Sequence, residues 1–129
     1  MTTQRSEFAQ YCCELLSAAG VCVVKRMFGG YGISTDGLSI AIVADLGDGE
    51  KLWLKANAET AKLFEKAGCE RFTYTAKGKL KSMAYYSAPN EAMESAKEMA
   101  YWARLALDAA LLARNKKVNL SKISTCTID

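Results

Sequence analysis

The chain has 129 residues and a formal net charge of +3, and half of its residues are hydrophobic. A chain of this length is typical of one domain that folds without a stabilising metal or disulfide. It contains no histidine, which excludes Ser-His-Asp and Cys-His catalytic arrangements. A carboxylate or lysine mechanism would still be chemically open, but no pattern indicates one, so we predict no catalytic residues and no cofactor.

The expected compartment is the cytoplasm. No apolar run reaches the ~18 residues that a membrane span needs, and the opening MTTQRSEF lacks the apolar core of a signal peptide. The cysteines are odd in number and show no CxxC spacing, so we expect reduced thiols and no metal site. They are Cys12, Cys13, Cys22, Cys69 and Cys126. Cys126 lies in a polar tail, where it could form an adventitious intermolecular disulfide.

The first half of the chain predicts one helix followed by four strands. Apolar residues recur at helical spacing over residues 3–19, and Gly20 follows as a helix stop. Residues 21–55 then change to short β-rich runs joined by glycine turns, the clearest being Asp36-Gly37. Alternation in LSIAIVAD places Leu38, Ile40 and Ile42 on one face of a strand. We expect an antiparallel meander here.

The second half predicts a helix, a hairpin and a long helix. Asn57 is the expected N-cap of a helix over residues 58–67. Two strands over 71–87 are joined by a tip at residues 77–79, and Pro89 is expected to open a helix over 90–116. The order indicates an α+β domain over residues 1–116, with one antiparallel sheet of five or six strands covered by helices on one face. Residues 117–129 have no pattern and are expected to form a loose tail.

The long C-terminal helix carries two apolar stripes. One should cover the sheet, and the other includes Trp102, Leu105 and Leu112. This second stripe must be buried either by the first helix or by another copy of the chain. With Tyr101 added, these residues are our candidates for self-association as a homodimer.

The stretch KRMFGGYG over residues 25–32 resembles a phosphate-binding loop only superficially. Such loops open a helix, whereas a β pattern follows here. One interpretation is a tight turn or bulge at Gly29 and Gly30, with Gly32 allowing a neighbouring side chain to approach closely. The alternative is a functional contact made by Lys25 and Arg26.

The same stretch carries a family resemblance. RMFGGYGI with its following DG turn, LWLKAN, FTYTAKGKLKSMAYYSAP and WARLALDAALLAR are similar, in order and spacing, to the TfoX (Sxy) N-terminal domain family. The resemblance spans residues 10–114. It implies a two-layer fold like that of secretion chaperones and a link to the regulation of natural competence and DNA uptake. Members of full length carry a second, helical domain, so this chain would correspond to the first domain alone. The matching signature residues are Arg26, Met27, Phe28, Gly29, Gly30 and Gly32.

Basic residues gather in one segment of the chain. Residues 51–81 hold eight Lys or Arg and three Glu, a charge of +5 that leaves −2 for the remainder. The predicted hairpin interleaves these basic residues with tyrosines, which is a pattern of single-strand binders. The alternative is a solvated hairpin whose lysines protect an edge strand from aggregation. The candidate nucleic-acid contacts are Arg71, Lys77, Lys79, Lys81, Tyr74 and Tyr85.

From these patterns we expect a non-enzymatic regulatory or adaptor domain that acts by protein contact. The alternative is a weak nucleic-acid-binding module that uses the 71–81 hairpin. The sequence does not identify the protein partner, and it indicates no membrane association.

Overall fold

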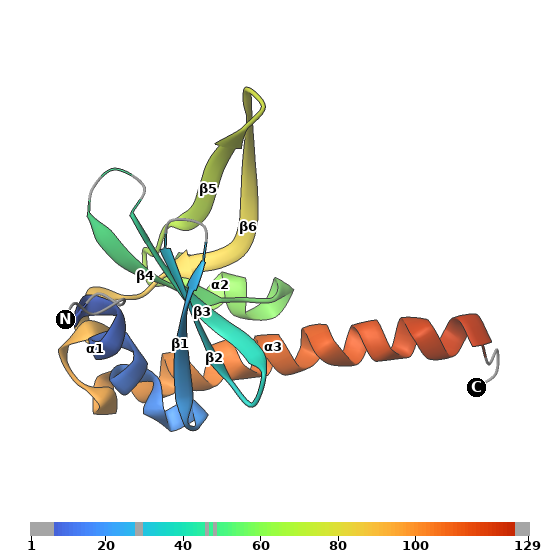
Figure 1. Cartoon of the computed structure of the whole chain (residues 1–129), viewed down its shortest axis with the longest axis horizontal. Coiled ribbons are helices and arrows are strands. Elements are labelled where there is room, and N and C mark those ends of the chain that lie inside the picture. Colours follow the sequence, from blue (N-terminus) through green and yellow to red (C-terminus); the bar gives the residue numbers. More distant parts are fainter. Residues whose placement is uncertain (1–6, 28–29, 46, 48, 126–129) are drawn as a thin grey trace.

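The computed structural model describes residues 7–27, 30–45, 47 and 49–125, with the backbone alone for Met27 and from residue 115 onward. The described residues form a six-stranded sheet, two short α-helices, two 3₁₀ helices and one long C-terminal α-helix. Figure 1 shows how they are arranged. The elements, in chain order, are α1 (Glu7–Leu15), the 3₁₀ helix η1 (Leu16–Ala19), β1 (Cys22–Met27), β2 (Gly30–Thr35), β3 (Leu38–Asp45), β4 (Glu50–Lys55), α2 (Ala58–Lys66), β5 (Arg71–Ala76), β6 (Lys79–Ser87), η2 (Asn90–Glu94) and α3 (Ala96–Thr125).

The sheet is antiparallel throughout, with strand order β1-β2-β3-β4-β6-β5. β1 to β4 form the expected meander, and β6 then pairs with β4 over residues 85–87 only. The rest of the β5–β6 hairpin extends beyond the other strands (Figure 1). The predicted α+β class, single antiparallel sheet and long C-terminal helix are confirmed.

The predicted face assignment of β3 is wrong at its middle. Ile33 pairs with Ala41 but Ser34 pairs with Ser39, so Ile40 is an extra residue that forms a bulge. A one-residue slip turns every following side chain to the opposite face. Ile40 therefore packs in the main core, whereas Ile42 lies in a separate cluster across the sheet.

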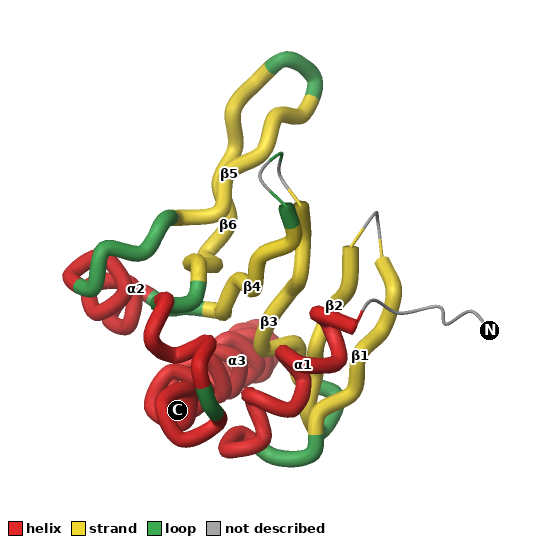
Figure 2. The backbone as a smooth tube through the Cα atoms, turned by 90° about the vertical axis from the view of Figure 1, so that its left-hand side faces the viewer, coloured by secondary structure: helices red, strands yellow, loops and turns green. Residues whose placement is uncertain are grey.

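The helices cover one face of the sheet. Figure 2 shows α3 running beneath the central strands and α1 beside β1. The main core between these layers contains Leu16 from η1, Leu52 and Leu54 from β4, and Met99 from α3. The opposite face, which we call the helix-free face, carries a smaller cluster of Ile42, Trp53, Phe72 and Tyr85.

Local signals define α2 and the two hairpin turns. The Asn57 side chain accepts hydrogen bonds from the backbone N–H groups of Glu59 and Thr60, and the Thr60 hydroxyl accepts one from the Asn57 N–H. This reciprocal capping satisfies N–H groups that have no partner within the helix. The turns at Asp36-Gly37 and Lys77-Gly78 each have two consecutive positive φ angles, as a two-residue hairpin turn requires.

The long helix begins later and ends later than predicted. Residues 90–94 form the 3₁₀ helix η2, and Ser95 is extended, with φ −164° and ψ 160°. The Ser95 hydroxyl accepts a hydrogen bond from the Glu98 N–H at 3.2 Å, so this serine caps α3. The helix then continues past Lys116 to Thr125. The division of the chain at residue 116 stays a prediction.

None of the helices, over the residues that the structure describes, is long and apolar enough to cross a membrane.

Candidate functional site

The stretch over residues 25–32 includes the end of β1 and the start of β2, which pair with each other. Met27, at the end of β1, pairs with Gly30 at the start of β2. A strand rather than a helix follows these glycines, so the geometry of a phosphate-binding loop is absent from the part that is described. Phe28 and Gly29 fall outside the described residues. Arg26 is exposed and pairs with Tyr31.

Gly30 has a packing role. A Cβ atom at this position would collide with the carbonyl oxygen of Val43 on the neighbouring strand. Gly32 is buried and pairs with Ile42 on the helix-free face, where Ile42 in turn pairs with Trp53. Gly30 is therefore needed for the packing of β2 against β3, whereas the predicted role of Gly32 stays a prediction.

The helix-free face is built around Trp53. Its indole ring meets Phe72 edge-on, with centroids 5.0 Å apart, and it is 3% exposed. The indole N–H has no hydrogen-bond partner among the described residues, which costs about 1–3 kcal/mol for a buried donor. Packing against Ile42 and Phe72 therefore holds the ring in place.

The residues predicted to contact nucleic acid do not all lie on one face of the β5–β6 hairpin. Tyr74 pairs with Lys81, and the next pair on the same face is Ala76 with Lys79. The Tyr74 ring is 37% exposed and lies near the Phe72 ring, at a centroid distance of 6.3 Å. Tyr74, Lys79 and Lys81 are thus brought together on an extension of the helix-free face. Lys77 lies in the turn at the tip.

Arg71 and Tyr85, the other two predicted nucleic-acid contacts, have different surroundings. Arg71 lies on the helix side, where its guanidinium stacks 5.7 Å from the Tyr86 ring centroid and donates to the Tyr86 hydroxyl at 3.1 Å. Tyr85 is on the helix-free face but buried, with its hydroxyl 3.3 Å from that of Ser39. Arg71 points away from Lys79 and Lys81, and Tyr85 is too buried to stack on a base.

The four candidates for self-association are all on α3 but differ in exposure. Tyr101 is 48% exposed and Leu112 is 42% exposed, while Leu105 is half-buried. The spacing of four and seven residues places these three on one strip of the helix. The exposed Asp108 also lies on this strip.

Trp102 is covered in a way that the sequence did not reveal. Its ring lies 5.0 Å from Phe64 of α2 and 5.1 Å from Tyr101, measured between centroids. The covering element is therefore α2, whereas we expected the first helix or a second copy of the chain. The Phe64 ring also stacks on Tyr86 of β6 at 5.5 Å, so α2 joins the long helix to the sheet.

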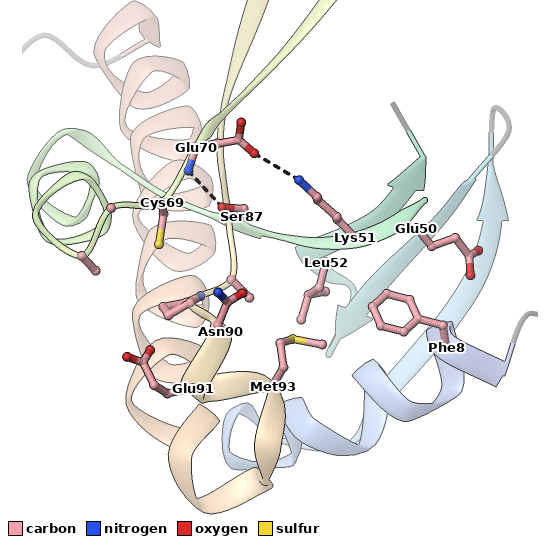
Figure 3. Close-up of a pocket in the computed structure, with 14 residues that line it drawn as sticks. Phe8, Glu50, Lys51, Leu52, Cys69, Glu70, Ser87, Asn90, Glu91 and Met93 are labelled. Atoms are coloured by element: carbon pink, nitrogen blue, oxygen red, sulfur yellow. Dashed lines mark hydrogen bonds and ion pairs between the residues drawn. The ribbon is translucent and has the colours of Figure 1, made fainter. Parts of the chain in front are cut away.

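A cavity of about 610 Å³ opens between α1, β4, η2 and the segment that precedes β5. Figure 3 shows Phe8, Leu52 and Met93 facing one another on one side. Lys51 and Glu70 form an ion pair at 3.2 Å on the other side. No sequence signal marked this cavity, because its walls come from four separate parts of the chain.

The ionisable groups of the cavity do not form a recognisable catalytic set. Burial raises the pKa of the Cys69 thiol, although a hydrogen bond with Ser87 opposes this effect. A thiol with a raised pKa is protonated at neutral pH and is a weak nucleophile. Across the described ranges, no group of three or more Cys, Asp or Glu side chains is placed to hold a metal ion.

The comparison with protein families gives a match over most of the chain. The model of the TfoX N-terminal domain matches residues 14–110, a span that begins in α1 and ends in α3. The search of curated proteins finds no match. Since the matched span covers most of the chain and includes all six strands, this protein belongs to the TfoX N-terminal domain family.

Proposed function

We propose that this chain is a regulatory domain of the competence-regulator type that acts by binding protein rather than by catalysis. Membership of the TfoX N-terminal domain family supports the regulatory role. The cytoplasm is the proposed compartment, because Cys12, Cys22 and Cys69 are thiols rather than half-cystines. The long helix α3 makes this protein contact, and the partner that it binds is a second copy of the chain.

The observation that carries this proposal is the projection of α3 from the body. The helix has 30 residues and is therefore about 45 Å long. Figure 1 shows its C-terminal half extending past the sheet. Tyr101 and Leu112 remain exposed along it, and large apolar side chains on an open helix strip are typical anchors of helix–helix contacts.

Sedimentation velocity tests this proposal over a broad range of protein concentration. The expected mass rises from the monomer value of 14.1 kDa toward twice that value. The double variant Tyr101→Ser/Leu112→Ser should stay monomeric at concentrations where the unmodified protein is dimeric. Leu80→Ser is the matched control, because Leu80 is 74% exposed but lies on the hairpin.

A constant monomer mass at every concentration would refute self-association through α3. If Leu80→Ser weakened the dimer as much as the Tyr101→Ser/Leu112→Ser variant does, the contact would not be specific to the exposed strip of α3. Circular dichroism of each variant establishes that the fold is retained, so a loss of the dimer can be assigned to the exposed strip.

A further inference from the structure

The pairing of the strands determines on which face of the sheet each charged side chain lies. Lys25 pairs with Gly32, Gly32 with Ile42, and Ile42 with Trp53. This row places Lys25 on the helix-free face with Trp53. Residues two positions apart on a strand share a face, so Lys51 and Lys55 lie there as well.

The same face continues onto the hairpin. The Phe72 ring contacts Trp53 on the helix-free face, and Tyr74 follows Phe72 by two residues. The register then adds Lys81, opposite Tyr74, and Lys79, opposite Ala76. The face therefore carries Lys25, Lys51, Lys55, Lys79 and Lys81.

No acidic side chain of the described strands shares this face. Asp45 and Glu50 pair with each other, two residues beyond the Val43–Leu52 pair that packs in the main core. Lys51 is neutralised by Glu70. The other four lysines make no ion pair with any residue that the structure describes, so the face presents about four uncompensated positive charges.

Aromatic rings lie between these charges. The Lys55 ammonium is 5.2 Å from the centroid of the Tyr85 ring. Tyr74 is directly opposite Lys81 and more than a third exposed. Directly opposed residues have Cβ atoms about 5 Å apart. One accessible ring with a lysine beside it matches the requirements of a nucleotide, since a base can stack on the ring while its phosphate meets the ammonium.

We propose that the helix-free face binds single-stranded nucleic acid, with Lys25, Lys55, Lys79 and Lys81 at phosphates and Tyr74 stacked on a base. A single strand is favoured over a duplex because paired bases are already stacked and offer no free face to Tyr74. The surface lies across the sheet from α3, so this activity is independent of self-association through the long helix.

Fluorescence anisotropy with a labelled oligothymidine of about 20 nucleotides tests the proposal. Four phosphate contacts predict a slope of about −3 for the logarithm of affinity against that of salt, or an about 50-fold loss between about 50 and about 200 mM salt. Lys79→Gln/Lys81→Gln should reduce this loss to about sevenfold. Lys62→Gln/Lys66→Gln removes the same charge from exposed positions on α2 and should leave the slope unchanged.

Tyr74 provides the test of stacking. Tyr74→Ala should weaken binding about tenfold, while Tyr74→Phe keeps the ring and should bind as the unmodified protein does. Absence of binding at low salt would overturn the proposal. So would equal affinity for a duplex of the same length, equal effects of the hairpin and α2 variants, or a Tyr74→Ala variant with unchanged affinity.

Discussion

At the scale of single residues, Gly30 has a steric role in the sheet. The carbonyl oxygen of Val43 occupies the space that a Cβ atom would need. The collision is with backbone rather than with the end of a flexible side chain, so β2 and β3 would have to move apart. The packing of the sheet therefore requires a glycine at this position.

Replacing this glycine should destabilise the protein. Gly30→Ala is expected to cost about 2 kcal/mol through overpacking and to lower the midpoint of thermal unfolding by several degrees, measured by circular dichroism. Ser82→Ala, an exposed change on β6, should alter stability by less than about 0.5 kcal/mol. A Gly30→Ala variant as stable as this control would contradict the proposed steric role.

One buried thiol, Cys12, and one partly buried thiol, Cys22, should make stability depend on pH in the alkaline range. Burial, helped by the nearby charge of Glu50, raises the pKa of Cys12 from 9.0 to about 12. Burial likewise raises the pKa of Cys22 to about 11. The folded protein therefore retains protons that the unfolded chain releases above pH 9. The stabilising contribution is complete below that pH and is lost as the pH rises through the folded pKa values.

We expect the midpoint of thermal unfolding to fall between pH 9 and about pH 11 and to fall less steeply in Cys12→Ala. Differential scanning fluorimetry across this range measures both slopes. Between pH 7 and about pH 8.5 the thiol is protonated in both states, so the two slopes should agree there. Identical slopes above pH 9 as well would show that Cys12 does not titrate on unfolding.

At the scale of elements, the Tyr86 hydroxyl ties α2 to the hairpin. It donates to Glu65 Oε2 at 2.6 Å and accepts from Arg71 Nη1 at 3.1 Å. Burial and the hydrogen bond to Glu65 raise the pKa of Tyr86, so the hydroxyl stays protonated and keeps its donor. The Tyr86 ring itself is buried between the layers.

Removing this hydroxyl should cost about 1–2 kcal/mol in Tyr86→Phe, because both of its partners carry charge. Urea unfolding measures the change. Tyr85→Phe is a matched control one residue away, since its hydroxyl makes only a 3.3 Å contact with Ser39 and should contribute less. If the two variants lost equal stability, the hydrogen bonds of the Tyr86 hydroxyl to Glu65 and Arg71 would not contribute more to folding than the Tyr85 contact does.

The start of the long helix shows which local signals sequence reasoning can miss. Pro89 is the residue expected to open this helix, yet it precedes only the 3₁₀ helix η2. The pattern Ser95-x-x-Glu98 was present in the sequence as an N-cap signal, and the Ser95 side chain does cap α3. The two start signals lie six residues apart, and the α-helix begins after the second one.

At the scale of the whole molecule, the β5–β6 hairpin is the part of the sheet that makes the fewest contacts with other strands and helices. The Ala84 carbonyl oxygen still accepts a hydrogen bond from the Ala56 N–H. Beyond Ala84, the described strands of the hairpin pair only with each other, and both of its faces are largely exposed. Isolated two-stranded hairpins are marginally stable in water. The surface that carries Tyr74, Lys79 and Lys81 therefore lies on the least stable element of the sheet.

The rate of amide hydrogen exchange should therefore be higher in the hairpin than in the centre of the sheet. Backbone amides of residues 73–82 are expected to exchange much faster than those of β3 and β4, which lie at the centre of the sheet. Exchange measured by mass spectrometry on short peptides resolves the two regions. Protection of the hairpin equal to that of β3 would mean that a contact absent from this structure covers it.

Much of the fold follows from the sequence because its signals are local. Asn57, Asp36-Gly37 and Lys77-Gly78 each specify a cap or a turn within a few residues, and the alternation of hydrophobic residues marks the strands between them. The excess of basic residues over 51–81 was also visible. These features depend on backbone preferences and short periodicities, which do not require knowledge of distant contacts.

Tertiary structure alone decided which residues share a surface. The bulge at Ile40 moved Ile42 to the helix-free face, and α2 rather than a second copy covered Trp102. Pairing across four strands placed Lys25 on the same face of the sheet as Lys55, whereas Arg71 lies on the opposite face. The physical reason is that side-chain facing depends on strand register, and register is set by pairing between segments far apart in the chain.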